Sequence, residues 1–446
     1  MSESLASFIA SFDGSRLSDE VLGKATTGVI DGLSVIVAGA AEETSAAVHR
    51  ALARTGQLEG ESTILGTRHK AGMLDAALCN GVAAHAHDFD DVLQGHTTHP
   101  TTHLLPVLLA IAEQQKVTGR DFLEAYVVGL EAELGLAIAM GRAHYRAGWH
   151  STGTLGTVGA VASACRLLRL DERHTRHALG IGCSSAAGLR IASGSMVKPL
   201  HAGHAARIGV EAAVLAAEGF TGPSEPFTGR FGYYQAFSAE LNDTVPRWET
   251  DEGRRGTAVN RLSFKPYPCC GEATAAVQAA IIIREEINAA DIERITVKVC
   301  PLGREVLPFD LPRTPDEARF SAPYCVGAAF HQGQLGLEDF THEAVGREQI
   351  ADLAKRTSVE VDPDLPDPGA EVQVWATDGR HATRRIVVPE GNYQIGLRRE
   401  VAVAKFAACT AHLMGAGEAK RHFAELEHLR DGTNVSAVIR ALVPQD

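Results

Sequence analysis

The chain has 446 residues, of which 45% are hydrophobic and 22% charged, and its formal net charge is −13 at pH 7. This length exceeds what one hydrophobic core usually supports, so we expect more than one domain in a globular protein. The acidic balance argues against a nucleic-acid partner, which would need a basic surface, but a local cluster of Lys, Arg and His can still bind an anionic substrate.

Helical periodicity dominates about the first 260 residues. In the segment from Thr118 to Arg142, Thr118 fits a helix N-cap, and apolar residues recur at every fourth position from Phe122 to Ile138. Glycines in the segment after it, Gly156 and Gly159, predict close approach of two backbones. The predicted helices cover 18–40, 43–56, 118–142, 154–170, 171–188 and 200–218.

The stretch HAHDFDDVLQGHTTHPTTH, residues 85–103, holds five histidines and three aspartates. We predict a polar loop or helix end there, whose histidines and carboxylates are the usual groups of proton transfer. One alternative is a solvated surface loop. Another is a divalent metal bound by His85, His87 and Asp88, but the HExxH spacing is missing, so we predict no metal and no cofactor.

The composition changes after about Phe264, where short strand-like runs appear between helical ones. Asp378-Gly379 is a typical hairpin turn, and the chain reads as helical again from Arg399. We predict a mainly α fold with a large all-helical domain (1–264 and 396–446) and a smaller α+β domain with an antiparallel sheet (265–395). The ligand site is expected between the two domains. The predicted strands are 293–301, 356–364, 370–378 and 380–389, with helices at 271–288 and about 315–331.

Cysteine usage and the N-terminus indicate the cellular setting. Eight cysteines occur without a CxxC pair, which predicts buried, reduced thiols in a cytoplasmic protein. The first residues, MSESLASFIASFDGSRL, show no signal peptide, and apolar runs such as DGLSVIVAGAA read as too short to span a membrane. We therefore predict no membrane partner.

Three further segments carry chemically useful side chains. HYRAGWHSTGTLG contains Tyr145 and His150, SGSMVKPLHAGHAAR contains Lys198 and His201, and LSFKPYPCCGEAT contains Lys265 and Cys270. Each also has a structural interpretation as a capping lysine, a core histidine or a buried thiol. The P-loop, the GxSxG elbow and a GxGxxG between strand and helix are all missing.

Four motifs in order, AHAHDFDDVLQGHTTHPTTHLLPVLLA, WHSTGTLGTVGAVASACRLLRL, MVKPLHAGHAARIGVEAAVLAAEGFTGP and FKPYPCC, resemble the 2-methylcitrate dehydratase (MmgE/PrpD) family over nearly the whole chain. The resemblance implies a large helical domain with a smaller α+β lid, a homodimer, and cofactor-free chemistry on di- or tricarboxylates. Carried over by motif, the family's active-site positions fall on Asp88, His99, His150, Lys198 and Lys265.

The chain departs from the family pattern in the last motif. Decarboxylase-like members continue this loop with histidines, where this chain has Cys270 and, less securely aligned, Thr274. A thiol in place of a histidine weakens a dehydratase or decarboxylase scheme. It remains serviceable in an epimerase, which needs one acid/base on each face of a single carbon, provided that the pKa of the thiol is pulled toward neutrality.

The resulting hypothesis is a cofactor-independent epimerase of an imino- or amino-dicarboxylate, similar to iminodisuccinate epimerase. The first alternative is a 2-methylcitrate/citrate dehydratase or cis-aconitate decarboxylase-type lyase. Two others are a catalytically inactive family member that binds metabolites or serves as a scaffold, and a metal-dependent hydrolase. Substrate binding is assigned to Lys198, Lys265 and His201, and Lys198 also polarises the substrate. Proton transfer is assigned to Tyr145, His150 and Cys270. The further catalytic residues are Asp88 and His99.

Overall fold

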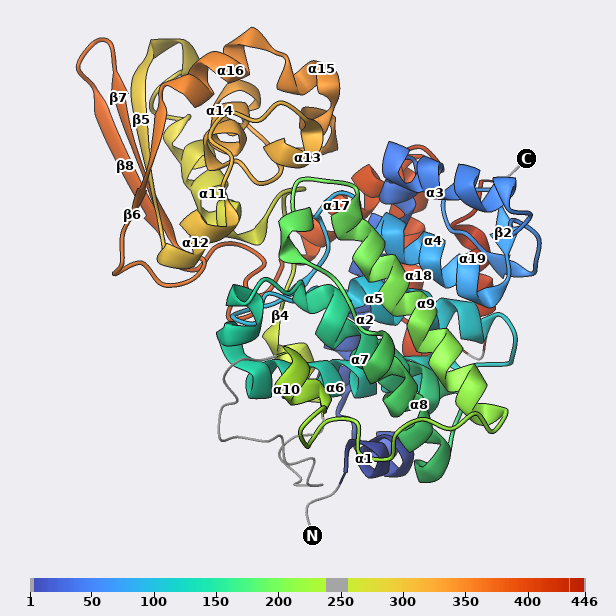
Figure 1. The fold of residues 1–446 in the computed structure, drawn as a ribbon. Coiled ribbons are helices and arrows are strands. Elements are labelled where there is room, and N and C mark those ends of the chain that lie inside the picture. Colours follow the sequence, from blue (N-terminus) through green and yellow to red (C-terminus); the bar gives the residue numbers. More distant parts are fainter. Residues whose placement is uncertain (1–3, 238–255, 433, 445–446) are drawn as a thin grey trace.

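The computed structural model describes residues 4–237, 256–432 and 434–444 and consists of two bodies (Figure 1). The larger body is helical and contains both ends of the chain, and the smaller one holds a β-sheet with helices packed against it. The main hydrophobic core of the larger body includes side chains from Leu5 to Phe264 and again from Phe406 to Leu442. That of the smaller body runs from Cys269 to Ala382. The chain is therefore mainly helical with a separate α+β part, as predicted. The domain boundaries themselves stay a prediction, and residues 1–3, 238–255, 433, 445 and 446 lie outside the described part.

The larger body is built from helices of very different length. Its helices are α1 (Leu5–Ser11), α2 (Asp19–Ala40), α3 (Glu43–Arg54), α4 (Met73–His85), α5 (Thr101–Ala112), α6 (Gly119–Arg146), α7 (Ser151–Leu167), α8 (Glu172–Ser185), α9 (Val197–Ala217), α10 (Tyr233–Phe237), α17 (Arg399–Cys409), α18 (Ala416–Leu426) and α19 (Ser436–Ala441). Short 3-10 turns are η1 (Gly14–Arg16), η2 (Arg190–Ala192), η3 (Ala258–Arg261) and η7 (Leu429–Asp431), and the two-residue strands are β1 (Ser62–Thr63), β2 (Lys70–Ala71), β3 (Val92–Leu93) and β4 (Leu262–Ser263).

Small residues let the central helices α4, α5, α7 and α9 pack closely. A Cβ atom at Gly81 of α4 would lie 2.7 Å from the Cα atom of Gly203 in α9. A Cβ atom at Gly156 of α7 would lie 2.4 Å from the ring of His103, which hydrogen-bonds the buried carboxylate of Glu133. The close neighbour of Gly156 is thus a side chain, and His103 serves packing. The predicted approach of two backbones is confirmed at Gly159, where a Cβ atom would lie 3.2 Å from the carbonyl oxygen of Gly129 in α6.

The start of helix α6 was predicted correctly, and its end was not. Its N-cap is Thr118, whose hydroxyl accepts a hydrogen bond from the backbone N–H of Asp121 at 3.1 Å, as predicted. The helix continues beyond the predicted Arg142, after a non-helical residue at Gly141 with φ of 56°. This extra turn carries Tyr145 toward the smaller body.

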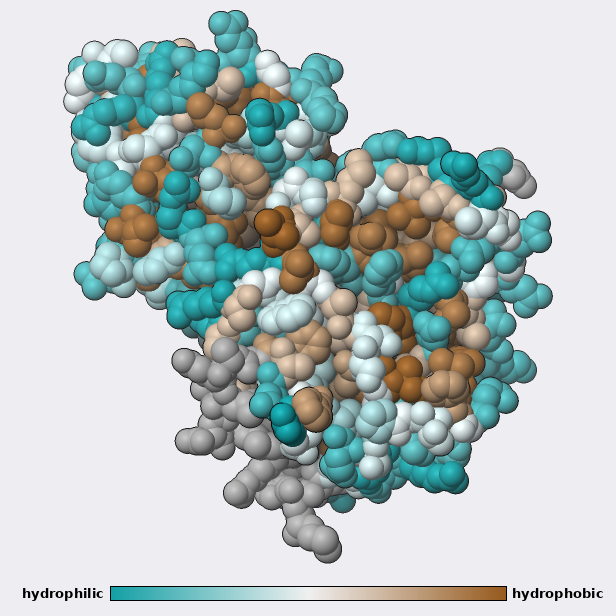
Figure 2. Space-filling view, in the orientation of Figure 1, coloured by the Kyte–Doolittle hydropathy of each residue, from teal (hydrophilic) through white to brown (hydrophobic). Residues whose placement is uncertain are grey.

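Helix α2 (Asp19–Ala40) closely matches the predicted helix 18–40. Its 22 residues are long and apolar enough to cross a membrane, but 83% of its most apolar window is buried inside the protein. It is therefore a core helix of the larger body. On the face shown in Figure 2, apolar side chains gather over the larger body, while the smaller body is mostly hydrophilic.

The sheet of the smaller body has the strand order β6-β5-β7-β8. Its strands are β5 (Ile292–Val299), β6 (Thr357–Val361), β7 (Ala370–Ala376) and β8 (His381–Ile386). The predicted turn at Asp378-Gly379 joins β7 and β8 as an antiparallel pair, and β5 and β7 are antiparallel as well. The prediction of a wholly antiparallel sheet is wrong for β5 and β6, which run parallel. Helices α12 to α16 separate these two strands, and such a crossover returns the chain in the same direction.

The remaining elements of the smaller body are helices and 3-10 turns. They are η4 (Gly271–Ala273), α11 (Thr274–Ile283), η5 (Ala289–Asp291), α12 (Pro301–Val306), α13 (Pro315–Ala318), α14 (Ala322–Gln332), η6 (Leu337–Phe340), α15 (His342–Val345) and α16 (Glu348–Lys355). Figure 1 shows α11 and α14 against one side of the sheet, with α12 at the end that faces the larger body.

The connections between the two bodies lie side by side. The backbone N–H of Phe264 donates to the carbonyl of Gly391 at 2.8 Å, and a Cβ atom at Gly391 would lie 1.9 Å from the carbonyl oxygen of Phe264. Strand β4, just before this crossing, pairs with β3 in the histidine-rich loop. The loop is therefore fixed at the junction of the two bodies.

Candidate active site

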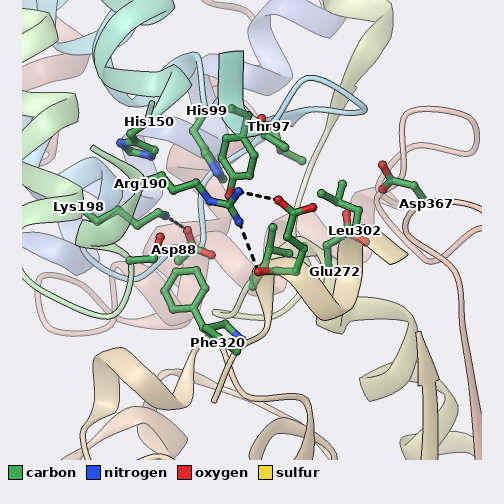
Figure 3. Close-up of a pocket in the computed structure, with 18 of the residues that line it drawn as sticks. Asp88, Thr97, His99, His150, Arg190, Lys198, Glu272, Leu302, Phe320 and Asp367 are labelled. Carbon is green, nitrogen blue, oxygen red and sulfur yellow. Dashed lines mark hydrogen bonds and ion pairs between the residues drawn. The ribbon is translucent and has the colours of Figure 1, made fainter. Parts of the chain in front are cut away.

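A cavity of about 390 Å³ lies between the two bodies. Side chains of both bodies line it, and Figure 3 shows Asp88, His99, His150 and Lys198 on one side with Glu272 and Asp367 farther along the wall. The structure brings together seven of the eight residues predicted for the site: Asp88, His99, Tyr145, His150, Lys198, Lys265 and Cys270. The eighth, His201, does not belong to the described lining.

Asp88 is the centre of a buried group of charges. Its carboxylate is ion-paired with Lys198 from the first turn of α9, and Lys265 lies 3.1 Å from its Oδ2 atom. Lys265 also donates to the backbone carbonyl of Asp88 at 2.6 Å. Burial alone would raise the pKa of Asp88, but the two ammonium groups outweigh it and hold the pKa below its ordinary value. Asp88 is thus an ionised carboxylate with two cationic partners.

The backbone at this point is strained. Asp88 has φ of 50°, and Thr97, which also lines the cavity, has φ of 51°. Non-glycine residues rarely adopt this left-handed conformation, and where they do, the surrounding structure holds them. The close contacts of Asp88 with both lysines are what hold it here.

Asp90 joins two histidines and sets the protonation of one of them. Its carboxylate oxygens lie 2.9 Å from Nδ1 of His85 and 2.7 Å from Nδ1 of His99. The Nδ1 atom of His99 also lies 2.9 Å from the carbonyl oxygen of Asp91, which can only accept. The neutral His99 ring therefore carries its proton on Nδ1 and leaves Nε2 as the basic atom.

The shifted pKa values of His99, Asp90 and His85 determine which of these side chains are charged near neutral pH. Burial lowers the pKa of His99 below its ordinary value, although Asp90 partly opposes the change. Burial would raise the pKa of Asp90, but His85 and Lys265 hold it well below its ordinary value. Burial also lowers the pKa of His85 to about 3. His99 is accordingly a neutral base beside an ionised carboxylate.

His150 is the N-cap residue of α7 and contacts His201 rather than solvent. Their Nδ1 atoms are 3.0 Å apart, so one ring donates to the other. The Nε2 atom of His150 is buried and has no hydrogen-bond partner among the described residues. Burial, followed by the charge of Lys198, holds the pKa of His150 well below its ordinary value. His201 is placed to orient His150, and its predicted contact with substrate stays a prediction.

Tyr145 and Arg190 form a second polar group in the wall. The guanidinium carbon of Arg190 lies 4.1 Å from the centre of the Tyr145 ring. Arg190 Nη1 donates to Glu305 of α12 at 2.6 Å, which links the two bodies. Burial raises the pKa of Tyr145 to about 12 even with Arg190 nearby, so its hydroxyl is a proton donor near neutral pH.

Cys270 and Glu272 follow Lys265 in the wall formed by the smaller body. Burial, and then the charge of Asp88, raises the pKa of the Cys270 thiol above its ordinary value. The expected shift of this pKa toward neutrality is therefore not found, and the thiol is protonated. Burial, and then Asp367, also raises the pKa of Glu272, while Asp367 is paired with Arg142 at 2.6 Å. This end of the cavity therefore carries a carboxyl group whose raised pKa favours its neutral form, next to the ion pair of Asp367 with Arg142.

The charges at Asp88 oppose the metal interpretation of the histidine-rich loop. His85, Asp88, Asp90 and His99 offer atoms within 4.8 Å of one another, the spacing of a metal cluster. However, both oxygens of Asp88 already face lysine ammonium groups, whose charge would repel a divalent cation. His87, a member of the predicted ligand set, points away and bonds Arg319 at 3.0 Å.

Lys405 supports the histidine-rich loop from behind. This buried lysine of α17 donates to the carbonyl of Phe89 at 2.7 Å and to that of Lys265 at 3.0 Å. Its ammonium group also pairs with Asp31 of α2 at 2.6 Å. Lys405 thus fixes the residues next to Asp88 and the backbone of Lys265 to the core of the larger body.

Sequence reasoning missed several residues of the site. Asp90 was visible in the DFDD run, two positions from Asp88, but spacing alone does not show which aspartate meets a histidine. Glu272 was visible two positions after Cys270 in LSFKPYPCCGEAT but was not singled out. Arg190 and Glu305 carry no motif and enter the site only because the two bodies meet.

Comparisons with known proteins agree with this architecture. A model of the MmgE/PrpD N-terminal domain matches residues 3–244, and one of the MmgE/PrpD C-terminal domain matches residues 267–431. Cis-aconitate decarboxylase of Mus musculus is 28% identical over 465 residues, covering 99% of this chain and 93% of the mouse protein. That of Homo sapiens is 29% identical over 360 residues (76% and 73%). The cis-aconitate decarboxylase-like protein oryM of Aspergillus oryzae is 27% identical over 418 residues (87% and 86%).

Proposed function

The chain belongs to the MmgE/PrpD family, and from that premise we propose that it is a lyase acting on a tricarboxylate of the cis-aconitate or citrate type. The observation that carries the proposal is the pair of lysines at Asp88 beside the neutral base His99, in one cavity. The named relatives favour a lyase over the epimerase that the sequence led us to expect.

The lysines supply what lyase chemistry on a polycarboxylate needs. When a C–C or C–H bond next to a carboxylate breaks, the electron pair spreads toward the carboxylates that remain, and fixed positive charges stabilise it. Lys198 and Lys265 provide two such charges in a buried setting, where their interaction with an anion is strongest. Asp88 keeps both lysines in place.

Proton transfer falls to the histidines. In decarboxylation, CO2 leaves, its bonding electrons form a new double bond, and the former double-bond carbon takes up one proton. A bound polyanion raises the pKa of a neighbouring imidazole, so His99 beside Asp90 can carry that proton. In dehydration, the neutral His99 removes the proton next to a carboxylate, and a protonated group such as Tyr145 delivers one to the departing hydroxyl.

The epimerase remains the second candidate, because a neutral thiol and a basic imidazole line the same cavity. Cys270 can give a proton to a planar intermediate, and His99 or His150 can take one from the starting material. The raised pKa of Cys270 makes its return to the thiolate difficult, and reversible exchange on both faces requires that return. This supports the lyase more than the epimerase.

A single experiment in D2O separates these activities. The purified protein is incubated with cis-aconitate, citrate, 2-methylcitrate and an amino-dicarboxylate, and products are followed by NMR and mass spectrometry. We expect a product lighter by CO2 that carries one deuterium, or an unsaturated acid formed with loss of water. Deuterium at the stereocentre of an otherwise unchanged dicarboxylate, with no lyase product, would overturn the proposal in favour of the epimerase.

The two other hypotheses, an inactive binding protein and a metal-dependent hydrolase, predict different results. Lys198→Met, which removes one cation from Asp88, serves as the inactive control for the lyase. Tight binding of a tricarboxylate without turnover or exchange on any compound would favour the inactive binding protein. Activity that disappears after exhaustive chelation and returns with a divalent cation would favour the metal-dependent hydrolase or another metal enzyme.

A further inference from the structure

Arg190 offers a third positive charge to the cavity, apart from the two lysines at Asp88. It lies in η2, between α8 and α9, and the local backbone is well fixed. Its N–H donates to the carbonyl of Gly148 at 2.9 Å, and the N–H of His150 donates to that of Gly188 at 3.0 Å. Figure 3 shows the Arg190 side chain extending into the cavity. The residue is thus held in place by the same segment that carries His150.

The guanidinium group is oriented for a carboxylate. Its flat face rests on the Tyr145 ring, with 4.1 Å between the guanidinium carbon and the ring centre. One edge points at Glu305, since Nη1 donates to Oε1 at 2.6 Å and Nη2 reaches the backbone carbonyl at 3.4 Å. An arginine placed over an aromatic ring binds carboxylates through this N–H edge, which here holds Glu305.

The two acidic partners of the cavity cations differ in how easily they can be displaced. Asp88 is 3% exposed and closed in by both lysines, so removing it from them would leave a buried charge. The side chain of Glu305 is 33% exposed and that of Arg190 is 22% exposed. A partly exposed ion pair contributes little to stability, and Glu305 can turn to water when another anion takes its place.

We propose that Arg190 is a specificity-determining residue that binds a second carboxylate of the substrate, and that Glu305 occupies its place in the empty site. The inference rests on the proposed function for the class of substrate, a compound with carboxylates far enough apart to reach both Arg190 and the lysines. Substrate binding then exchanges an ion pair between the two bodies for one between substrate and protein.

The test measures binding of propane-1,2,3-tricarboxylate by isothermal titration calorimetry. Arg190→Gln removes a charge-assisted, two-point contact, so we expect the Kd to rise roughly 10- to 100-fold. Arg190→Lys keeps the charge but loses the fork, and should fall in between. Arg304→Gln is the matched control: this arginine lies next to Glu305 on α12, pairs with Asp310 and is outside the cavity lining, so its loss should leave the Kd unchanged.

Glu305→Gln provides the decisive second variant, because a folding defect cannot mimic its effect. Removal of the competing carboxylate should lower the Kd severalfold, and only while Arg190 is present. In the double variant Arg190→Gln/Glu305→Gln the gain should vanish. A Kd that rises in Glu305→Gln, or an Arg190→Gln variant that binds as the wild type does, would overturn the inference.

Binding and turnover distinguish the failure of this inference from failure of the proposed function. If no compound is converted but Arg190→Gln still weakens tricarboxylate binding, the lyase proposal fails and the role of Arg190 stands. If lyase activity is found and Arg190→Gln changes neither Kd nor KM, the lyase proposal stands and the proposed role of Arg190 fails.

Discussion

Asp90 shows how a single carboxylate can define the chemistry of its neighbours. It lies between His85 and His99, is 1% exposed, and is ionised because these rings and Lys265 oppose the effect of burial on its pKa. Since it faces Nδ1 of His99, the basic Nε2 atom is left for the cavity. Asp90 is therefore a positioning residue for His99, although no motif assigns it this role.

We expect Asp90→Asn to reduce kcat/KM by about tenfold or more, but by no more than the 10²- to 10⁴-fold that acid–base catalysis contributes. Asp90 raises the pKa of His99, so its removal lowers that pKa further. The acid limb of the kcat/KM profile should move to lower pH, which a purely structural defect would not produce. The pH–rate profile of the variant beside that of the wild type is the measurement, and an acid limb at unchanged pH would contradict the assignment.

His87 is a second single residue with a role of its own, because it makes the free energy of unfolding depend on pH. Burial, and then Arg319, lowers its pKa from 6.5 to about 3 in the folded protein. Between these values the unfolded chain binds a proton that the folded protein does not. Its contribution to stability is complete above pH 6.5 and is lost as the pH falls toward 3.

His87→Gln should remove this part of the pH dependence while its amide oxygen still accepts from Arg319. Two pKa units, from about pH 6.5 to about pH 4.5, correspond to roughly 2–3 kcal/mol. Urea unfolding at both pH values should show a smaller loss of stability in the variant by about this amount. His428→Gln, at a position whose side chain is 81% exposed, is the control, and equal losses in wild type and His87→Gln would refute the prediction.

At the scale of elements, α17 completes the site from the far end of the sequence. Lys405 on this helix binds two backbone carbonyls, one beside Asp88 and one at Lys265, together with the buried carboxylate of Asp31. Removal of one partner from a buried pair leaves an uncompensated charge, whereas replacement of both by apolar side chains is often neutral.

Lys405→Met should therefore destabilise the protein by about 3–5 kcal/mol and reduce kcat. In Asp31→Leu/Lys405→Met we expect stability to recover while kcat stays low, because the carbonyls of Phe89 and Lys265 still lack their donor. Chemical unfolding and steady-state kinetics of both variants provide the comparison. Recovery of kcat together with stability would show that Lys405 serves the fold alone.

At the scale of the whole molecule, the site depends on the meeting of two bodies. Asp88, His99, His150 and Lys198 come from the larger body, and Cys270, Glu272 and Glu305 from the smaller one, with Lys265 at the junction. A ligand in the cavity contacts both bodies, so its binding should stabilise both of them against unfolding. The expected homodimer stays a prediction.

Saturating propane-1,2,3-tricarboxylate should raise the melting temperature of the wild type. A ligand at 100 times its Kd adds about 2.7 kcal/mol to the free energy of unfolding. Lys198→Met should lose most of this increase, while the same ionic strength supplied as sodium chloride should not reproduce it. A shift of equal size in wild type and variant would mean that the anion acts outside the cavity.

Periodicity and motifs in the sequence predicted much of the fold. The N-cap of α6, its apolar stripe from Phe122 to Leu134 and the hairpin at Asp378-Gly379 were predicted correctly, because each depends on residues near one another in the chain. Ile138, the last residue of the predicted stripe, is 46% exposed. The parallel pairing of β5 with β6 was not predicted, since it depends on how five helices return the chain to the sheet. Likewise, the residues of the site that carry a motif were found, and Arg190, Glu272 and Glu305 were not.

The histidine-rich stretch from His85 to His103 shows the same difference between local sequence features and contacts made in the folded protein. Its sequence alone predicted a reactive polar loop, because few other segments could combine so many imidazoles and carboxylates. Only the tertiary structure decided which side chains face the cavity: His99 and Asp88 line it, while His85 holds Asp90, His87 meets Arg319 and His103 packs on α7. The protonation of these groups follows from burial and from charges brought in by α9, α17 and the smaller body, and such contacts between distant segments form only when the whole chain has folded.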